Sequence, residues 1–174
     1  ESLLTPAEAN MLLAGITLDT RNFTKGAGTK TFAAAMYLRD NGASYDDIQD
    51  LFKANITDYK QEALFGQKIE VYRHCMAIAV NEFGSDAGDK ILASRVADNL
   101  LMVEEVVASF ALVQLGDSVH VSARSNGTVN VQLILESLSG GGRYDAAGAV
   151  VRNGMQQALL MLKDAIDKYL DPED

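Results

Sequence analysis

The chain opens with a complete signal for the start of a helix. Thr5 is an N-cap residue, Pro6 takes the first helical position and Glu8 follows the cap by three residues, which is the pattern of a capping box. A helix is therefore predicted from Pro6 to about Leu13. Apolar residues recur at helical spacing farther along, and they predict helices over 29–39, from Ser44, and from Thr57 to about Lys68.

A short apolar run, residues 14–18, follows the first predicted helix. Its length and composition predict a buried strand that ends at Asp19. Ligands bind at the carboxyl ends of strands in α/β folds, so Asp19 is a candidate metal ligand. An aspartate that closes a turn or caps a helix is the alternative at this position.

Strands and helices alternate from about Val71 onward. Strands are predicted over 75–80, 107–115, 119–124 and 147–151, and helices over 89–103, 130–138 and 153–170. Gly116-Asp117 predicts a hairpin turn. The order predicts an α/β fold with a small mixed β-sheet flanked by helices. A hinge is expected between Lys53 and Thr57, which divides the chain into domains 1–55 and 56–174.

The charge balance limits the partners that the chain can bind. It has 15 basic residues among 174 and a net charge of −9. Non-specific binding to nucleic acid depends on clustered lysine and arginine, so a long nucleic acid is not an expected partner. A small anion held at one local site is compatible with this composition.

Cysteine usage and hydropathy indicate the compartment. The single cysteine, Cys75, excludes an internal disulfide and fits a reducing environment, so a cytoplasmic location is expected. No stretch approaches the ~18 apolar residues that cross a bilayer, and no direct membrane contact is expected from this segment. Because the chain begins at Glu1 and the predicted strand 14–18 has no partner before it, we expect a fragment of a longer protein.

Residues that suit an anion gather at the end of the predicted strand 119–124. Ser122 and Ser125 carry hydroxyl groups and Arg124 a planar guanidinium, all of which can donate hydrogen bonds to phosphate oxygens. The alternative for Arg124 is a surface residue or a salt-bridge partner. Asp98, on the predicted helix 89–103, is expected to have a structural role as a cap or as a partner of Arg95.

A glycine run lies about sixteen positions after Arg124. Gly140, Gly141 and Gly142 lack Cβ atoms, so the backbone can adopt positive φ and direct several N–H groups at one ligand oxygen. Arg143 follows at once. A flexible linker is the alternative for such a run, although its position between a capped helix and a strand favours an ordered site.

These motifs carry a resemblance to a known family. The segments VSARS (121–125) and GGGRYDAAG (140–148) resemble the DHHA1 substrate-binding domain of the DHH phosphoesterases. Residues 13–23 and 29–35 resemble the end of the family's catalytic DHH domain and the start of its linker. The context of 124–125 and 129–132 is most similar to the membrane-anchored cyclic-di-AMP phosphodiesterases of Gram-positive bacteria.

The resemblance implies both an organisation and an activity. Residues 1–55 would be the incomplete end of a DHH catalytic domain, with its last strand and linker helices, and 56–174 a DHHA1 domain. The full-length protein would be a hydrolase in signaling, a manganese-dependent phosphodiesterase for cyclic-di-AMP or short oligonucleotides. A cyclic or linear dinucleotide would bind in this chain, and two manganese ions would take one contact from Asp19. The substrate-binding residues would be Ser122, Arg124, Ser125, Gly140, Gly141, Gly142 and Arg143.

The chain departs from the family pattern in two respects. It lacks the family's histidine-x-aspartate and aspartate-histidine-histidine motifs, and His74 and His120 stand in unrelated contexts, so the fragment alone is expected to be inactive. Arg143 stands where the family usually has histidine. Arginine keeps the positive charge but does not titrate near neutral pH, so a phosphate-clamp role survives and a proton-transfer role does not.

A non-catalytic module is the rival interpretation. Related domains occur in proteins that handle tRNA, so a nucleotide-sensing or RNA-contacting role is the alternative function. The low basic content argues against RNA. A homodimer is left open by the sequence.

Overall fold

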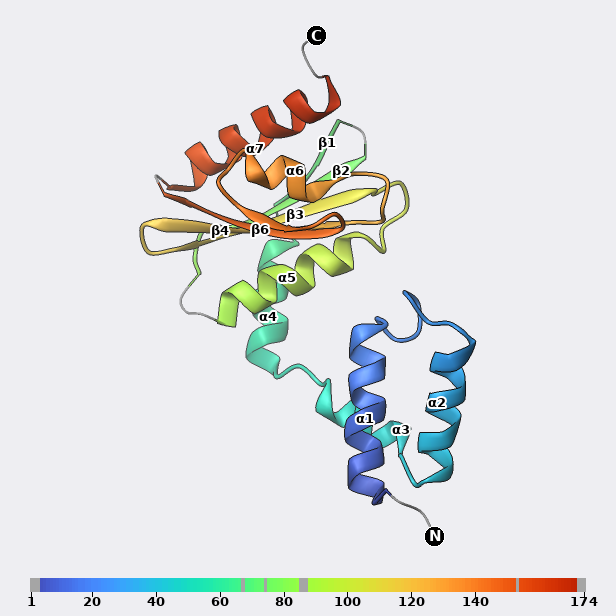
Figure 1. Ribbon diagram of the computed structural model, residues 1–174. Coiled ribbons are helices and arrows are strands. Elements are labelled where there is room, and N and C mark those ends of the chain that lie inside the picture. The colour runs from blue at the N-terminus through green and yellow to red at the C-terminus, as the bar shows by residue number, and fades with distance from the viewer. Residues whose placement is uncertain (1–3, 67, 74, 85–87, 153, 172–174) are drawn as a thin grey trace. The chain divides into compact units, whose positions relative to one another are not determined.

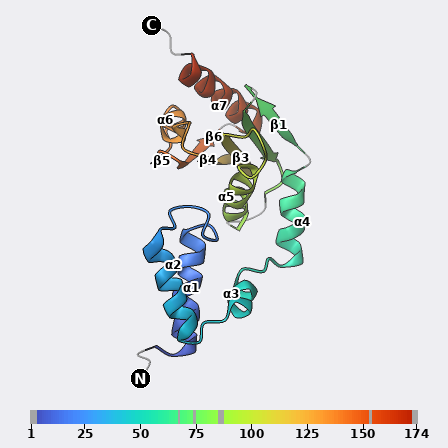
Figure 2. The ribbon, with the colours of Figure 1, turned by 90° about the vertical axis from the view of Figure 1, so that its right-hand side faces the viewer.

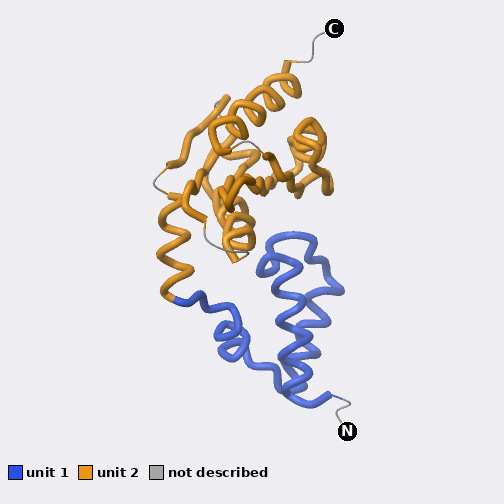
Figure 3. The backbone as a smooth tube through the Cα atoms, turned by 90° about the vertical axis from the view of Figure 1, so that its left-hand side faces the viewer, with its two compact units in different colours: residues 1–55 blue, residues 56–174 orange. Residues whose placement is uncertain are grey.

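The computed structural model describes residues 4–66, 68–73, 75–84, 88–152 and 154–171. The chain falls into two compact units, residues 1–55 (unit 1) and residues 56–174 (unit 2), shown in separate colours in Figure 3. The boundary lies within the segment 53–57. The assignment of unit 1 to the end of a catalytic domain stays a prediction.

Unit 1 consists of helices α1 (Pro6–Asp19), α2 (Thr29–Asp40) and α3 (Tyr45–Leu51). The capping box at the start of α1 is confirmed: Thr5 Oγ1 accepts from the Glu8 amide at 3.3 Å, and Glu8 Oε2 accepts from the Thr5 amide at 2.8 Å.

The predicted strand over 14–18 is wrong, because α1 continues without a break to Asp19. The buried positions show the reason. Ala9, Leu13 and Thr17 are buried at a spacing of four residues, whereas Leu18 is 69% exposed. This is the periodicity of one helical face and not of a strand buried on both sides. Asp19 therefore lies at the end of a helix.

A left-handed turn follows α1. Arg21, Asn22 and Phe23 have φ values of 46°, 57° and 63°, a conformation that costs L residues other than glycine roughly 1–2 kcal/mol each. Hydrogen bonds hold the turn, from the Asn22 amide to the Thr17 carbonyl oxygen at 2.7 Å and from the Phe23 amide to Thr20 Oγ1 at 3.0 Å. These hydrogen bonds thus fix the path of the backbone immediately after Asp19.

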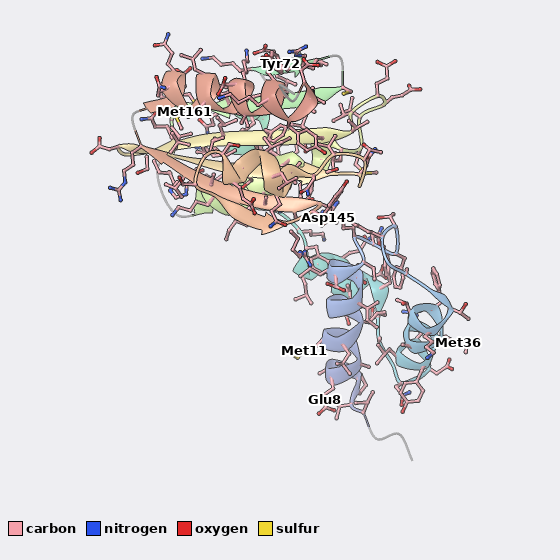
Figure 4. The ribbon with its side chains drawn as sticks, turned by 45° about the horizontal axis from the view of Figure 1, so that its top comes forward. Glu8, Met11, Met36, Tyr72, Asp145 and Met161 are labelled. Carbon is pink, nitrogen blue, oxygen red and sulfur yellow. The ribbon has the colours of Figure 1, made fainter. Side chains whose placement is uncertain are left out.

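The core of unit 1 is small. Its buried apolar residues are Ala9, Leu13, Leu38, Ala43 and Ile48. Large apolar side chains point outward as well: Met11 on α1 and Met36 on α2, both labelled in Figure 4, are 73% and 65% exposed. The described part of unit 1 therefore leaves much of its apolar surface uncovered.

Unit 2 is built on a six-stranded sheet in the order β1-β2-β3-β4-β6-β5. Figure 1 labels all of these strands except β5, which is labelled in Figure 2. The strands are β1 (Ile69–Tyr72), β2 (Met76–Asn81), β3 (Ala108–Leu115), β4 (Ser118–Ser125), β5 (Gly141–Arg143) and β6 (Ala146–Arg152). The β2 and β3 strands are parallel and the other pairs are antiparallel. The predicted mixed α/β fold is confirmed, with Gly116-Asp117 as the turn between β3 and β4.

Helices cover both faces of this sheet. Helices α4 (Ile56–Phe65) and α5 (Gly88–Leu100) lie on one side, and α6 (Val131–Glu136) and α7 (Gly154–Leu170) on the other (Figures 1 and 2). Asn130 caps α6 as predicted, since its Oδ1 accepts from the Gln132 and Leu133 amides at 3.1 and 3.3 Å. The predicted cap of α7, Asn153, lies outside the described residues.

Strand β1 was not predicted, because its residues are mostly exposed. Contacts with α7 hold it: the Tyr72 hydroxyl donates to Asp167 Oδ2 at 2.8 Å and Arg73 Nε donates to Asp167 Oδ1 at 2.8 Å. Hydrogen bonds from Arg73 and from Tyr72 lower the pKa of Asp167. Polar contacts thus tie the edge of the sheet to α7, in addition to the packing of Tyr72 against the core.

Strands β4 and β6 alternate strictly between the two faces. Their odd-numbered residues, such as Val121 and Ala149, are buried in the core under α6 and α7. Their even-numbered residues face the side of α5. Helix α5 packs on β3 and β4, so β6 and β5 extend the sheet beyond it.

Candidate functional site

A row of small residues crosses the face of the sheet beside α5. Strand pairing places Ser122 of β4 opposite Gly148 of β6, and Gly148 opposite Gly141 of β5. Two of these three positions have no Cβ. We call Ser122, Gly148 and Gly141 the floor row, because a ligand lying on it can approach the backbone of the sheet closely.

An open cleft of about 500 Å³ lies over this floor row. Helix α5 and the start of β5 contribute side walls. The lining residues are Lys90, Ser94, His120, Val121, Ser122, Ser139, Gly140, Gly141, Gly148, Ala149 and Val150. Among these lining residues Lys90 is basic and His120 titrates near neutral pH, and none carries a carboxylate.

The wall between α5 and β4 is a ladder of three levels. Lys90, Ser94 and Asp98 recur every four residues on α5 and therefore form one stripe. The facing residues on β4 are His120, Ser122 and Arg124. We call these six residues the α5–β4 ladder.

Two levels of the α5–β4 ladder are closed by direct contacts. Arg124 Nε donates to Asp98 Oδ1 at 3.0 Å, which forms a salt bridge. The hydroxyl groups of Ser94 and Ser122 are 3.1 Å apart and share a hydrogen bond. At the third level Lys90 and His120 carry charge of the same sign when the imidazole is protonated.

The environment of His120 disfavours its charged form. Burial lowers the pKa of His120 below its ordinary value, and the nearby positive charge of Lys90 lowers this pKa further. At neutral pH the imidazole is therefore mostly neutral. Negative charge brought into the cleft would act in the opposite direction and raise this pKa.

The structure brings three of the predicted site residues together in the cleft, namely Ser122, Gly140 and Gly141. Arg124 does not line it. Its side chain is only 17% exposed and its guanidinium is held by Asp98. Asp98 therefore has the structural role that was expected, but its partner is Arg124, whereas Arg95 pairs with Glu62.

Ser125 and Arg143 also lie outside the lining. Ser125 is fully buried, and its Oγ accepts from the Gly127 and Val129 amides at 3.0 and 3.3 Å, so it fixes the turn after β4. Arg143 is exposed on β5, one row from the floor row, where strand pairing aligns it with Ala146 and Arg124. Both residues remain predictions as substrate contacts.

The positive φ expected for the glycine run is wrong for Gly140 and Gly141. Among these glycines Gly142 alone has a positive φ, 154°. The Gly140 amide donates to the Leu135 carbonyl oxygen at 2.8 Å, and Gly141 and Gly142 pair with β6 as part of strand β5. The run therefore does not form a ring of N–H groups around one anion.

The glycines are required for space instead. A Cβ on Gly140 would stand 2.4 Å from the Gly148 carbonyl oxygen, and a Cβ on Gly142 would stand 2.5 Å from Ala147 Cα. A Cβ on Gly141 would meet nothing within 4 Å. Two glycines thus allow β5 to lie against β6, while the third keeps the cleft open.

Asp19 belongs to unit 1. Its carboxylate is exposed at the carboxyl end of α1, where the helix dipole disfavours negative charge. A cation bound to the Asp19 carboxylate would offset this unfavourable interaction with the helix dipole. Across the described ranges there is no group of three or more histidine, cysteine, aspartate or glutamate side chains that could hold a metal ion. Asp19 as a metal contact stays a prediction.

Sequence reasoning missed Lys90, Ser94 and His120 as cleft residues. The signals were present: Lys90 and Ser94 share a helical stripe with Asp98, and His120 alternates with Ser122 on β4. These patterns become informative only once α5 is known to pack against β4.

The described helices include none with the length and hydropathy needed to span a membrane.

Known proteins resemble this chain over nearly all of its length. Cyclic-di-AMP phosphodiesterase GdpP of Geobacillus thermodenitrificans is 39% identical over 170 residues, covering 97% of this chain and 26% of that protein. GdpP of Bacillus subtilis is 41% identical over 167 residues, with 94% and 25% covered. For PdeA of Listeria monocytogenes the values are 39% over 164 residues, with 93% and 25% covered. The chain spans about a quarter of the length of these relatives.

A solved structure shares the fold. An exopolyphosphatase-related protein from Bacteroides fragilis superposes with a TM-score of 0.82 over 95% of this chain and 51% of that chain, at 19% identity. A family model described as the DHHA1 domain matches residues 75–171, which include β2 to β6, the floor row and the whole α5–β4 ladder. With more than half of its residues matched, the chain belongs to the DHHA1 domain family.

Proposed function

We propose that this chain is the C-terminal part of a cyclic-di-AMP phosphodiesterase and that the cleft of unit 2 binds the dinucleotide. The observation that carries the proposal is the lining of the cleft, where Ser122, Gly140 and Gly141 come together from distant parts of the chain. The 39–41% identity to relatives named as cyclic-di-AMP phosphodiesterases supports the substrate class.

The spacing of charges along the floor suits an elongated anion. Arg143 lies on one side of the floor row, next to the Arg124–Asp98 salt bridge, and His120 with Lys90 lies on the other. His120 and Arg124 are four residues apart on β4, which corresponds to about 13 Å along a strand. A dinucleotide carries two phosphates on an extended scaffold, so its charges can reach both sides while its uncharged parts lie over the glycines.

Metal-assisted hydrolysis is part of this proposal. Two manganese ions would polarise the phosphodiester and activate water when bound. Asp19 offers a hard carboxylate oxygen, which suits such an ion, and the fixed turn of residues 21–23 holds the backbone beside it. One carboxylate fits one ligand position, so the other ligands would belong to regions that the longer relatives contain.

The isolated chain is expected to show no phosphodiesterase activity, even with excess manganese. The described residues contain no group of three or more suitable ligands, and a pair of ions requires more than Asp19. Incubation of the purified chain with cyclic-di-AMP and manganese, followed by chromatography, checks this expectation. Manganese-dependent formation of linear product would contradict it.

Binding in the cleft is tested by NMR titration of the isotope-labelled chain with cyclic-di-AMP. Backbone amide signals of Ser122, Gly140, Gly141 and Gly148 are expected to move together and to saturate. A second cleft of about 600 Å³, lined by Gln114, Asp117, Ser118, Arg152 and Gly154, provides the control region. Shifts confined to that region, or no saturable shifts at all, would exclude the proposed site.

The same titration at several salt concentrations separates this proposal from an RNA-contacting role. A dinucleotide releases few counterions, so its affinity should fall shallowly with salt. A single-stranded oligoadenylate that binds more tightly and with a steep salt dependence would favour the RNA-contacting alternative. In the proposed role the protein acts on a cytoplasmic signalling nucleotide.

A further inference from the structure

We propose that Lys90 and His120 form an anion subsite in the cleft, which holds one phosphate of the dinucleotide and makes its binding pH-dependent. The inference rests on the proposed function, in that it assumes a dinucleotide in the cleft. It adds two binding residues that lie outside both sequence motifs.

The α5–β4 ladder carries the argument. Its first level, Asp98 with Arg124, is a salt bridge of 3.0 Å, and its middle level, Ser94 with Ser122, is a neutral hydrogen bond of 3.1 Å. The level formed by Lys90 and His120 has two basic groups and no acidic partner among the residues that line the cleft. An anion bound between Lys90 and His120 would supply the negative charge at this level, as Asp98 does for Arg124.

The position of this level within the cleft is favourable. Lys90 and His120 both line it, and so do the hydroxyl-bearing residues Ser94 and Ser122. An anion here would therefore have an ammonium, an imidazolium and hydroxyl donors within one wall, and charge-assisted hydrogen bonds are the strongest of these. Arg124, in contrast, already has Asp98 as a partner.

The other groups around His120 do not supply a counter-charge. Strand pairing places Val113 of β3 and Val150 of β6 beside it. Arg152 lies two positions farther along the same face of β6, where it lines the second cleft together with the oppositely charged Asp117. From α5, Lys90 is exposed toward the cleft and Asp89 is buried, with an interaction of its own. Lys90 is therefore the charged group that acts on the imidazole, and its charge is positive.

A pH dependence with a definite sign follows. In the free chain the pKa of His120 is lowered by burial and by Lys90, so the imidazole is mostly neutral at pH 7. A phosphodiester keeps its single negative charge over this range and would favour the imidazolium. Binding then takes up a proton, so the affinity rises as the pH falls.

The charge contribution is tested by calorimetric titration of cyclic-di-AMP into Lys90→Gln at pH 6. Lys90 is exposed, so the substitution should leave the fold intact, and the affinity should fall about tenfold. Lys60→Gln is the matched control, because Lys60 is an exposed lysine on α4 outside the cleft lining. It should bind like the unchanged chain.

The histidine is tested by its own titration. The chain has two histidines, so the imidazole signal that disappears in His120→Gln belongs to His120. Cyclic-di-AMP should raise the pKa of that imidazole, and the affinity of the unchanged chain should rise severalfold between pH 7.5 and 5.5. In His120→Gln this rise should be lost, with the amide shifts of the floor row retained.

The outcomes separate the two proposals. Normal binding in the cleft with wild-type affinity in Lys90→Gln and an unchanged pH profile in His120→Gln would overturn the subsite and leave the proposed function standing. Absence of saturable binding by the unchanged chain would overturn both. A tenfold loss in Lys60→Gln as well as Lys90→Gln would show a general charge effect and would also reject the subsite.

Discussion

Replacement of Gly140 by alanine is expected to destabilise unit 2 by about 1–3 kcal/mol, the cost of overpacking a well-packed position. The new Cβ would stand 2.4 Å from the Gly148 carbonyl oxygen and 2.9 Å from the Leu135 carbonyl oxygen. Neither atom can move freely. Gly148 pairs with strands on both of its sides, and Leu135 accepts the hydrogen bond of the Gly140 amide.

Urea unfolding followed by circular dichroism measures this loss, and Gly141→Ala is the matched control. A Cβ at Gly141 has open space around it and its φ is not positive, so its effect on the free energy of unfolding should stay within about 0.5 kcal/mol. Equal unfolding midpoints for Gly140→Ala and Gly141→Ala would contradict the tight approach of β5 to β6.

Gly141→Val is expected to weaken the binding of cyclic-di-AMP at least a hundredfold while unit 2 stays folded. Valine suits an exposed strand position, and its side chain would enter the cleft above the floor row. The valine side chain would lift the dinucleotide off the backbone of the floor row, and a hundredfold loss of affinity corresponds to about 2.8 kcal/mol, at roughly 1.4 kcal/mol for each decade. The effect arises from volume, since no positive φ is blocked at this position.

A series of side chains of increasing volume at position 141 tests whether volume causes the loss of binding. Affinity should fall from glycine to alanine to valine at position 141, with unfolding midpoints nearly constant across the series. Calorimetry gives the affinities and urea unfolding gives the midpoints. A valine variant that binds as tightly as the unchanged chain would place the dinucleotide away from the floor row.

Local signals were sufficient for much of the fold. The capping residues Thr5 and Asn130 and the turn at Gly116-Asp117 were identified correctly, because each depends on hydrogen bonds or dihedral angles of neighbouring residues. The run 14–18 was misassigned, because a short apolar stretch is compatible with either period until its exposed side is known. Strand β5 was missed because glycines have low strand propensity, and here pairing with β6 decides the conformation.

The site was predictable only in part, because several of its contacts form only when elements distant in the sequence pack together. Ser122 and the glycines 140–141 carry recognisable motifs, and the structure places them in one cleft. The partner of Arg124 could not be read from the sequence, since Asp98 is 26 residues away and meets it only when α5 packs on β4. Lys90 and His120 were passed over for the same reason, because they are 30 residues apart and share one cleft only when α5 packs on β4.

The floor row has a consequence for how this binding surface can evolve. Its glycines present backbone and no side chain to the cleft, while the charged positions around it, Lys90 and Arg143, are exposed and contribute nothing to the apolar core. If the cleft binds the dinucleotide as proposed, substitutions at Lys90 and Arg143 would alter which nucleotide is preferred at little cost in folding free energy. In the proposed binding mode, ligand preference and fold stability depend on nearly separate sets of residues, so one can diverge under selection while the other is maintained.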